Sequence, residues 1–381
     1  MGKKKIAFIV AIPLTARVFL MDHIEYLKKE YEVHLIANFV AEKDKKEFEI
    51  KNIVCHTAPI LRSINLLKDV VGLITLVRIF KKQQFECVHS LTPKAGLLTA
   101  LAGKLVGIPN RVHIFTGQVW ATRKGIMRFV LKSMDKLIVS CDTRLLVDGE
   151  GQRQFLIKEG VLNEGNSIVP AEGSIAGINL DRFIISEKIR KEERSHLGLA
   201  DNDVVYIFLG RLNHDKGIGE LYEAFNRLVK VCPNAKLLFY GVDEDDYDSK
   251  ITLYPNIKKG ENYFFPGITR TPFKALQAGD VFVLPTWREG FGVSVLEAQA
   301  LGLPVITSDA YGVVDASVEN VTGLRCGVND PEGLYRAMKK YYNDADLRRQ
   351  CGIAGRKRVE DKFSNERVSL AWLDIYKEML D

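Results

Sequence analysis

The chain has 381 residues, which is more than one hydrophobic core normally serves, so its length predicts two domains. A composition of 46% hydrophobic and 27% charged residues is ordinary for a globular protein and excludes a disordered or low-complexity chain. No apolar run is long enough to cross a bilayer, which excludes a membrane-spanning helix from the expected structure.

The charge is distributed unevenly along the chain. Residues 1–170 contain 26 lysine and arginine residues against 16 acidic residues, and the segment 51–136 alone contains 14 against 3. The whole chain has a formal net charge of +6, so the second half is on balance acidic. A strongly basic first half indicates an anionic partner, such as a membrane surface, a lipid phosphate or a nucleic acid.

Two features bear on the cellular compartment. The N-terminal stretch MGKKKIAFIVAIPLTAR starts with basic residues, but its apolar part ends at Pro13 without a small-residue cleavage site. We therefore expect a first buried strand rather than a signal peptide. The six cysteines are scattered and form no Cys-x-x-Cys or metal-spaced pair, so buried thiols in a reducing cytoplasm are the simplest interpretation.

In the first half, short β-branched apolar runs alternate with amphipathic segments. The runs predict buried strands at Lys5–Ala11, Val33–Ile36, Cys87–Ser90, Val112–Phe115 and Lys136–Ser140. The segments between them predict helices at Val18–Lys29, Leu66–Lys82, Ala95–Val106 and Gly125–Ser133. Such alternation predicts a parallel sheet with helices on both faces.

The alternation pauses at VPAEGSIAGINLDRF, residues 169–183, and then restarts. In the second half we expect a helix at Asn365–Leu380 and strands at Val204–Leu209, Lys236–Tyr240, Val281–Leu284 and Val305–Thr307. The pattern predicts an α/β fold with two Rossmann-like domains, residues 1–172 and 173–364. The final helix, 365–381, is expected to pack back on the first domain.

In open parallel sheets, ligands bind outside the carboxyl ends of the strands, so the strand-to-helix loops are the first places to search for function. The first such loop, IPLTAR, lacks the Gly-x-Gly-x-x-Gly pattern that brings a backbone close to a dinucleotide pyrophosphate. This disfavours a nicotinamide dehydrogenase. The sequence contains no Walker P-loop either.

The loop Gly210–Gly217, GRLNHDKG, directly follows the predicted strand VVYIFL. It places Arg211 and Lys216 near the carboxyl end of that strand. Arginine offers a bidentate fork to phosphate oxygens and lysine adds a point charge, so the two together can neutralise a diphosphate. A solvated basic turn is the competing interpretation of this segment taken alone.

The segment Thr286–Ala298, TWREGFGVSVLEA, follows the predicted strand VFVLP. Its two glycines flank a phenylalanine in a turn that opens a helix, where unpaired backbone N–H groups bind anions. Glu289 lies on the loop and Glu297 in the helix, so one carboxylate can meet a sugar while the other meets a ribose. Two unrelated surface glutamates are the competing interpretation.

Four motifs occur in order at suitable spacing: GRLNHDKG, Phe265-Pro266-Gly267, GDVFVLP, and EGFG with a second glutamate and LGLPVITSD. In this combination the chain resembles the large family four of retaining glycosyltransferases, which includes bacterial polysaccharide and lipid-linked-sugar transferases. The resemblance covers essentially the whole chain and is strongest in the C-terminal half. It implies the GT-B architecture, in which two facing Rossmann-like domains, one for the acceptor and one for the nucleotide-sugar donor, enclose a cleft.

The resemblance also implies roles for individual residues. Arg211 and Lys216 would hold the donor diphosphate, Glu289 would contact the transferred sugar, and Glu297 would bind the ribose. The base would contact Phe265, Pro266 and Gly267. The other donor-binding residues implied are Gly210, Gly290, Phe291, Gly292 and Val293.

Members of this family retain the anomeric configuration and need no metal, so the resemblance implies a UDP-sugar substrate without metal or further cofactor. The sequence agrees, because no Asp-x-Asp pair stands at a strand end. The acidic run Val242–Asp248 is interpreted as a solvated loop. The developing diphosphate charge would then be met by Arg211, Lys216 and a helix N-terminus.

The N-terminal half resembles a narrower group that acts on undecaprenyl-diphosphate-linked sugars, including the type that adds N-acetylgalactosamine to lipid-linked bacillosamine. The stretches that carry this resemblance are VHSLTPKAGLL, RVHIFTGQVWATRKG and EGSIAGINLDRF. Many members have a histidine where this chain has Thr116. The sequence leaves open whether His89, His113 or Thr116 faces the sugar, and His113 can equally be a core histidine. Thr15 and Arg17 are further acceptor-side candidates.

Two predicted helical stretches, Leu61–Lys82 and Trp120–Lys136, mix basic residues with Leu, Ile, Phe and Trp. An amphipathic basic surface can lie on anionic lipid, although a solvated face over a buried apolar side is the alternative. Combined with the lipid-linked acceptor implied above, the pattern predicts a peripheral protein on the inner face of the cytoplasmic membrane.

The sequence therefore predicts a retaining, metal-independent glycosyltransferase. It would move an N-acetylhexosamine or hexose from a UDP-sugar to a lipid-diphosphate-linked glycan in bacterial surface polysaccharide or glycan biosynthesis. A nucleotide-sugar epimerase on the same scaffold is the first alternative, since fold does not fix reaction. A nucleic-acid-binding module would explain the basic half but not the phosphate loop and paired glutamates, so no nucleic acid partner is expected.

Overall fold

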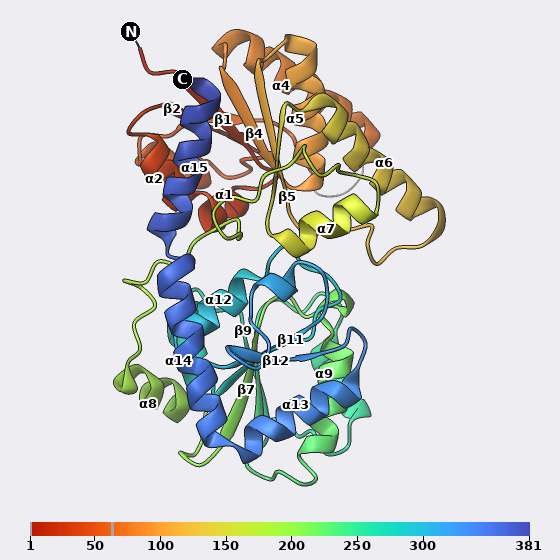
Figure 1. Cartoon of the computed structure of the whole chain (residues 1–381), viewed down its shortest axis with the longest axis vertical. Coiled ribbons are helices and arrows are strands. Elements are labelled where there is room, and N and C mark those ends of the chain that lie inside the picture. Colours follow the sequence, from red (N-terminus) through yellow and green to blue (C-terminus); the bar gives the residue numbers. More distant parts are fainter. Residues whose placement is uncertain (1, 62–64) are drawn as a thin grey trace. The chain divides into compact units, whose positions relative to one another are not determined.

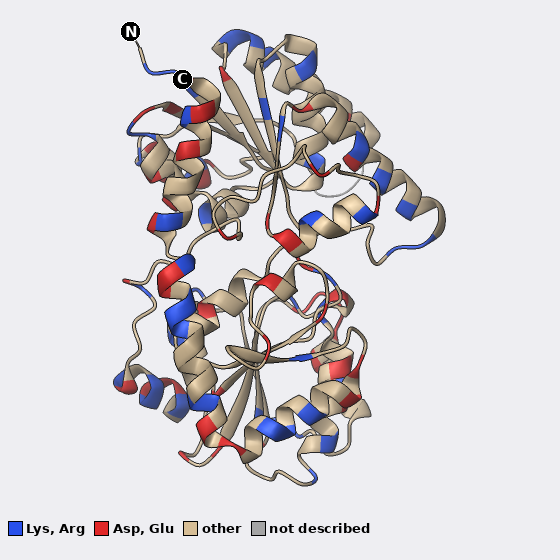
Figure 2. Ribbon diagram, viewed as in Figure 1, with Lys and Arg blue, Asp and Glu red and all other residues tan. Residues whose placement is uncertain are grey.

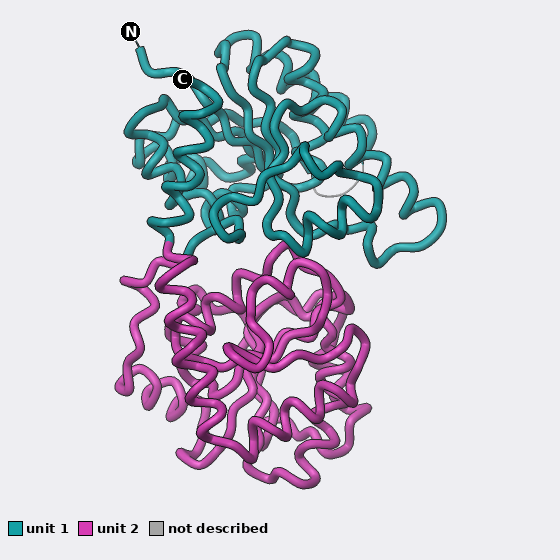
Figure 3. The backbone as a smooth tube through the Cα atoms, in the orientation of Figure 1, with its two compact units in different colours: residues 1–177, 365–381 teal, residues 178–364 magenta. Residues whose placement is uncertain are grey.

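A computed structural model describes residues 2–61 and 65–381. The chain forms two compact units, of which the first comprises Met1–Gly177 with Asn365–Asp381 and the second comprises Ile178–Ser364 (Figure 1, Figure 3). The division after Gly177 lies a few residues beyond the position predicted from the sequence. Within the predicted basic stretch Leu61–Lys82, residues 62–64 lie outside the described residues.

The first unit contains a six-stranded parallel sheet in the order β3-β2-β1-β4-β5-β6. Its strands are β1 (Lys5–Ile9), β2 (Glu32–Ala37), β3 (Val54–Thr57), β4 (Cys87–Leu91), β5 (Asn110–Phe115) and β6 (Arg144–Val147). Every residue of β4 is buried, as expected for a central strand of a parallel sheet covered on both faces.

Eight helices are described in this unit: α1 (Pro13–Phe19), α2 (Met21–Leu27), α3 (Glu42–Glu49), α4 (Leu66–Gln83), α5 (Pro93–Val106), α6 (Gly125–Cys141), α7 (Glu150–Lys158) and α15 (Asn365–Leu380). Helix α15, drawn in dark blue, lies beside α2 (Figure 1). Its Trp372 ring stacks on His23 at a centroid distance of 4.2 Å and on His89 at 4.9 Å. The last helix therefore belongs to the core of the first unit.

One predicted strand of this unit is wrong. Lys136–Ser140 forms the end of α6, in which Asp135, Ile138 and Cys141 are buried at the three-residue spacing of one helix face. The strand follows later, at β6. Three further predictions misjudged the extent of an element. The strand Lys5–Ala11 ends at Ile9, the helix Val18–Lys29 is divided into α1 and α2, and the helix Gly125–Ser133 continues to Cys141.

The second unit contains another six-stranded parallel sheet, in the order β12-β11-β10-β7-β8-β9. Its strands are β7 (Val204–Leu209), β8 (Ala235–Tyr240), β9 (Tyr263–Gly267), β10 (Val281–Leu284), β11 (Val305–Ser308) and β12 (Gly323–Cys326). The two edge strands, β9 and β12, were not predicted from the sequence. Pro266 lies in β9 and is tolerated there because an edge strand has unpaired positions.

The helices of the second unit are α8 (Glu187–His196), α9 (Ile218–Leu228), α10 (Tyr247–Lys250), α11 (Pro272–Ala275), α12 (Val293–Ala300), α13 (Pro331–Asn343) and α14 (Ala345–Lys362). Short 3-10 turns occur at η1 (His214–Lys216), η2 (Ile251–Leu253), η3 (Leu276–Ala278) and η4 (Val313–Asp315). No helix among the residues that the structure describes is long and apolar enough to span a bilayer.

The strand order of the second sheet turns back between β7 and β10, which pair in parallel with Val281 beside Tyr206. Parallel strands end at the same edge of a sheet, so the loops that follow β7 and β10 are neighbours. This turning point is where open α/β sheets bind ligands. The fold thus brings the two charged motifs of the sequence together.

Candidate active site

Loops 210–217 and 285–292 meet at the carboxyl edge of the second sheet, where Lys216 and Glu289 form an ion pair. The ammonium of Lys216 donates a hydrogen bond to Oε1 of Glu289. The two side chains are only 16% and 17% exposed. At this exposure solvent screens the charges less than at the surface, so the pair is held firmly.

Two glycines allow the loops to approach this closely. Gly217 has a φ of 69°, and a Cβ atom there would collide with the carbonyl oxygen of Pro285. Gly312 has a φ of 83°, and a Cβ atom there would collide with the carbonyl oxygens of Glu289 and Gly290. A residue other than glycine is disfavoured at both positions, because its Cβ atom would collide with the neighbouring loop and because its backbone would be strained at a positive φ. The backbone around Glu289 is therefore held from two sides.

Arg211 lies in the same loop as Lys216 but has a different partner. Its Nη1 donates to both carboxylate oxygens of Glu244, at 3.0 and 2.8 Å. Asn213 Nδ2 donates to the same carboxylate at 2.7 Å. The Arg211 side chain is 48% exposed, so it can exchange this carboxylate for a phosphate at little cost.

The acidic run Val242–Asp248 is largely exposed, as the sequence predicted, but its carboxylates also contact the neighbouring loop. Besides the Glu244 contacts, Asp245 accepts a hydrogen bond from the His214 backbone N–H at 2.9 Å. Asp243 accepts from the backbone of Tyr247 and Asp248 at the start of α10. This run therefore supports the loop that carries Arg211 and Lys216.

Helix α12 begins directly beside Glu289. Its N-cap, Gly292, has a φ of 98°, and the chain enters the helix without a side-chain cap. The first N–H groups of a helix lack intrahelical partners and attract anions. Phe291 is buried, with its ring centroid 5.4 Å from that of Phe363. Its side chain points into the core and anchors the turn, so a ligand at this turn would not meet the Phe291 ring.

Glu297 lies in α12, one turn into the helix. Burial raises the pKa of its carboxyl to about 7, while the charge of Arg182 acts in the opposite direction. None of the described residues donates a hydrogen bond to this carboxyl. A half-buried carboxyl without a protein partner is suited to a hydroxyl-bearing ligand.

The segment predicted to contact the base, Phe265–Gly267, lies at the carboxyl end of β9, at the same edge of the second sheet as the two loops. The Gly210 N–H donates to the Tyr240 carbonyl at 3.0 Å, and the Gly241 N–H donates to the Gly267 carbonyl at 2.9 Å. A Cβ atom at Gly241 would collide with the Gly210 carbonyl, so the ends of β7 and β8 are tightly packed. In β9, Phe265 is half-buried and Pro266 is exposed.

Of the acceptor-side candidates in the first unit, His89 and His113 are core residues. His89 bonds the Tyr376 hydroxyl and His113 bonds Ser90, each at 2.8 Å. Both rings are buried, and burial lowers the pKa of each, to about 3 for His113. Both side chains therefore stay neutral and face the interior, so His113 has the surroundings of a core histidine.

The other candidates in this unit have mixed surroundings. Thr116 follows β5 and is half-buried, and its carbonyl accepts hydrogen bonds from Gln118 and Gln152 at 2.6 and 2.7 Å. Thr15 is buried in α1. Arg17 donates to Glu47 at 2.9 and 2.6 Å. Among these positions, Thr116 is the one at the carboxyl end of a strand.

Two charged residues that join the loops of the second unit, Asp215 and Arg288, were not predicted from the sequence. Asp215 precedes Lys216, Arg288 precedes Glu289, and Arg288 Nη2 donates to Asp215 Oδ2 at 2.7 Å. The sequence held one signal that could have predicted this pair. One motif contains Asp-Lys and the other contains Arg-Glu, and this order of charges permits two ion pairs between the loops.

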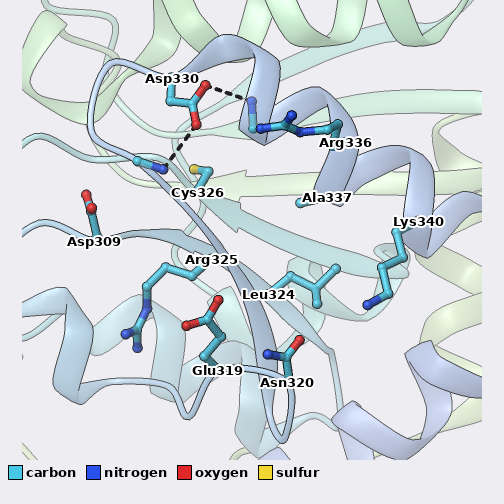
Figure 4. Close-up of a pocket in the computed structure, with 12 residues that line it drawn as sticks. Asp309, Glu319, Asn320, Leu324, Arg325, Cys326, Asp330, Arg336, Ala337 and Lys340 are labelled. Carbon is cyan, nitrogen blue, oxygen red and sulfur yellow. Dashed lines mark hydrogen bonds between the residues drawn. The ribbon is translucent and has the colours of Figure 1, made fainter.

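A cavity of about 550 Å³ lies elsewhere in this unit, along the edge strand β12 and helix α13 (Figure 4). Arg325 and Glu319 line one part of it, and Lys340 and Asn320 line another. None of the candidate site residues lines this cavity. Its position away from the β7 and β10 loops separates it from the charged site.

Metal-binding clusters are not found in the described part of the chain. No three histidine, cysteine or acidic side chains within it are placed to hold a metal ion. Each of the six cysteines is buried with a free thiol.

Two helices of the first unit expose apolar side chains together with basic ones. On α4, Gly72, Leu76 and Phe80 are buried, whereas the opposite face exposes Leu66, Leu67, Val70, Val71 and Ile74. On α6, the exposed apolar residues are Ile126, Met127, Phe129, Val130 and Leu137. Helix α5 packs against both helices. Figure 2 shows basic residues along α6 and in the loop before it.

The basic residues of this surface differ in their partners. Arg128 and Lys132 bind Glu159 at 2.8 and 2.7 Å and lie over the Trp120 ring. Lys81, Lys82, Arg123 and Lys124 are exposed, and no described acidic residue forms an ion pair with them. These four cations are available to an external anion. We call them, with the exposed apolar residues of α4 and α6, the α4–α6 surface.

Two protein families match the chain. The family described as "Glycosyl transferases group 1" matches residues 189–358, and "Glycosyl transferase 4-like" matches residues 5–140. The Staphylococcus aureus capsular polysaccharide biosynthesis glycosyltransferase CapM is 33% identical over 96% of this chain and 95% of its own length. An Escherichia coli galactosyltransferase, named as acting from UDP-Gal on α-D-GlcNAc-diphosphoundecaprenol, is 26% identical over 91% and 90% of the two chains.

Solved structures share the fold. The crystal structure of Anabaena HepE in complex with UDP and glucose superimposes with a TM-score of 0.81 at 16% identity, covering 98% of this chain and 99% of that one. WaaG, a glycosyltransferase of lipopolysaccharide biosynthesis, gives a TM-score of 0.74 at 16% identity, covering 97% and 99%.

Proposed function

Because the chain belongs to the glycosyl transferases group 1 family, we propose that it transfers a sugar from a UDP-sugar to a lipid-diphosphate-linked glycan, with retention of anomeric configuration. The names of two relatives support this proposal: the Escherichia coli enzyme acts on a diphosphoundecaprenol-linked sugar, and a Campylobacter jejuni relative, 26% identical over 72% of this chain, adds N-acetylgalactosamine to a diphospho-undecaprenol-linked sugar. Bacterial surface polysaccharide or glycan synthesis is the process proposed.

The observation that carries the proposal is the Lys216–Glu289 pair beside the start of α12. When the bond between the sugar and the diphosphate breaks, negative charge develops on the leaving phosphate. We propose that Lys216, the α12 N–H groups and, after release from Glu244, Arg211 stabilise this charge. These groups replace the charge that a metal would otherwise supply.

The proposal also gives roles to the two glutamates. Glu289 would accept hydrogen bonds from the transferred sugar, and Glu297 would bind the ribose hydroxyls. The acceptor hydroxyl would attack on the face that the diphosphate leaves, which retains the configuration without a protein nucleophile. The first unit would hold the acceptor, with Thr116 rather than the buried histidines on its sugar side.

We further propose that the α4–α6 surface docks on the inner face of the cytoplasmic membrane. A helix that is apolar on both its core side and its outer side, as α4 is, needs a second apolar environment. Anionic lipid supplies one, and each nearby cation contributes about 1 kcal/mol. Docking would bring the enzyme to a lipid-linked acceptor.

Replacement of the two cations tests the assignment of the site. Lys216→Ala is expected to lower turnover about 100-fold, which is the scale of losing one preorganised electrostatic contact. Arg211→Ala should also lower turnover. Arg227→Ala is the matched control, because it also removes a paired cation but one outside the two loops. Arg227 lies on α9 and pairs with Glu332 on α13 at 2.6 Å. Normal turnover in a folded Lys216→Ala/Arg211→Ala double variant would show that the diphosphate binds elsewhere.

A further inference from the structure

The two loops of the candidate site are joined through Asp215. Its backbone carbonyl accepts hydrogen bonds from Thr286 Oγ1 and from the Trp287 N–H, each at 2.8 Å. Its carboxylate oxygen Oδ2 accepts from Arg288 Nε at 2.9 Å and from Nη2 at 2.7 Å. One residue of the η1 turn therefore binds three consecutive residues of the loop after β10.

The joined segment is held by further contacts on both sides. The Trp287 Nε1–H donates to Glu220 on α9 at 2.8 Å, and the Trp287 ring lies 4.6 Å from that of His214. The Arg288 and Asp215 side chains are 15% and 22% exposed. A charge-assisted pair of this geometry and burial is stronger and more rigid than a surface ion pair.

The Asp215–Arg288 ion pair lies next to the Lys216–Glu289 ion pair of the candidate site. Asp215–Arg288 and Lys216–Glu289 are consecutive pairs between the same two loops, with the signs reversed from one pair to the next. A lysine has a long, flexible side chain, so its ammonium is not placed by its own backbone alone. Preorganised charge is what an electrostatic site requires.

We propose that Asp215 and Arg288 are positioning residues that hold Lys216 against the donor phosphate that carries the sugar, which is the terminal phosphate of the product UDP. Glu289 is the resting partner of Lys216, and the incoming phosphate displaces it, which frees the Glu289 carboxylate for the sugar. The inference rests on the proposed function, because it takes the donor to be a nucleoside diphosphate sugar. It concerns the phosphate next to the sugar, since Lys216 lies beside the sugar-contacting glutamate.

Binding of UDP and UMP tests the proposal, because UMP lacks the terminal phosphate. Asp215→Asn removes the charge but keeps the backbone carbonyl that binds Thr286 and Trp287. We expect the dissociation constant for UDP, measured by calorimetry, to rise roughly tenfold, the effect of losing about 1.4 kcal/mol, while that for UMP changes less than about twofold. The turnover number of Asp215→Asn should fall together with its affinity for UDP.

Variants of Arg288 and a remote control complete the design. Arg288→Gln should reproduce the selective loss of UDP binding, and Arg288→Lys, which keeps the charge but not the two-nitrogen contact, should recover part of it. Arg227→Gln should leave both affinities unchanged. Thermal unfolding of each variant checks folding, and Arg288→Lys serves if Arg288→Gln fails to fold.

Three results separate the outcomes. Equal loss of UDP and UMP binding, or no loss of either, in folded Asp215→Asn and Arg288→Lys proteins would overturn the positioning role. Wild-type protein that binds GDP and GMP in place of UDP and UMP would contradict the proposed uridine donor, and the same comparison would then be made with the guanine pair. Wild-type protein that binds neither diphosphate would contradict the proposed function itself.

Discussion

Lys216 and Glu289 lie 73 positions apart in the sequence and form one ion pair in the structure. The motifs predicted the residue types, because phosphate binding at a strand end calls for cations and glycines. They did not predict the pairing, which depends on how β7 and β10 sit side by side. Arg211, expected beside Lys216, binds Glu244 instead, and that partner lies in an acidic run whose sequence resembles a solvated loop.

His89 and His113 show the same limit. A histidine near the carboxyl end of a strand has the chemistry of a site residue, but side chains of a β-strand alternate between two faces. Only the position of α15 and Tyr376 reveals that His89 faces the core. That contact joins residues 287 positions apart, so no local pattern could have predicted it.

The Glu297 carboxyl predicts a specific dependence of stability on pH. Burial raises its pKa from 4.5 to about 7, so the folded protein favours the protonated form. The contribution of this carboxyl to the free energy of unfolding is fully present below about pH 4.5 and is lost as pH rises through about 7. The total change is about 3 kcal/mol at most. Glu297→Gln, which stays neutral, should therefore gain thermal stability relative to wild type between pH 5 and pH 8.

The measurement is the difference in unfolding midpoint between the two proteins at each pH. A difference that stays constant from pH 5 to pH 8 would show that this carboxyl ionises normally. Glu332→Gln, at an exposed ion pair, is the control and should show no such trend.

At the scale of elements, strongly periodic segments were predicted well and edge or mixed segments were not. Asn365–Leu380 and Leu66–Lys82 follow a helical period over several turns, and both are helices with nearly these bounds. Lys136–Ser140 contains apolar residues typical of a strand, but it continues the amphipathic period of α6. A short apolar run at the end of a helix cannot be distinguished from a strand by periodicity alone.

Helices α4 and α6 carry the prediction that concerns the membrane. Replacing Lys81, Lys82, Arg123 and Lys124 with Glu should reduce flotation with anionic vesicles, because surface attraction acts within a Debye length of about 8 Å at physiological salt. Donor binding should be unaffected, since the donor loops lie in the second unit. The loss should be largest at low salt.

Apolar contacts are tested separately on the same surface. Leu67→Ser/Phe129→Ser, at side chains 83% and 72% exposed, should remove the binding that persists at high salt. Val40→Ser, at an 89% exposed position outside the two helices, is the control. Equal flotation of the wild type and both variant sets at moderate salt would show that these helices do not dock.

At the scale of the whole molecule, the predicted α/β class with parallel sheets and GT-B relatives is confirmed. The chain leaves the first unit after Gly177 and returns to it at Asn365. The returning helix α15 fills the core of the first unit with Trp372 and Tyr376, both buried. Stability of the first unit therefore depends on the last residues of the chain.

Trp372→Ala tests this dependence. Loss of a large buried aromatic side chain costs about 3–5 kcal/mol, and the stack with His23 and His89 disappears with it. Hydrogen exchange should accelerate throughout residues 2–177 and in α15, while residues 178–364 stay protected. Acceleration confined to the second unit would contradict the assignment of α15 to the first.

The most direct test of the central claim is a transfer assay with a UDP-sugar and a lipid-diphosphate-linked glycan in the presence of EDTA. We expect release of UDP, a new glycosidic bond whose anomeric configuration by NMR matches that of the donor, and a rate equal to that with Mg²⁺. Conversion of the UDP-sugar to an isomer without acceptor would indicate an epimerase. Inversion at the anomeric carbon, or transfer abolished by EDTA and restored by Mg²⁺, would contradict the proposed mechanism.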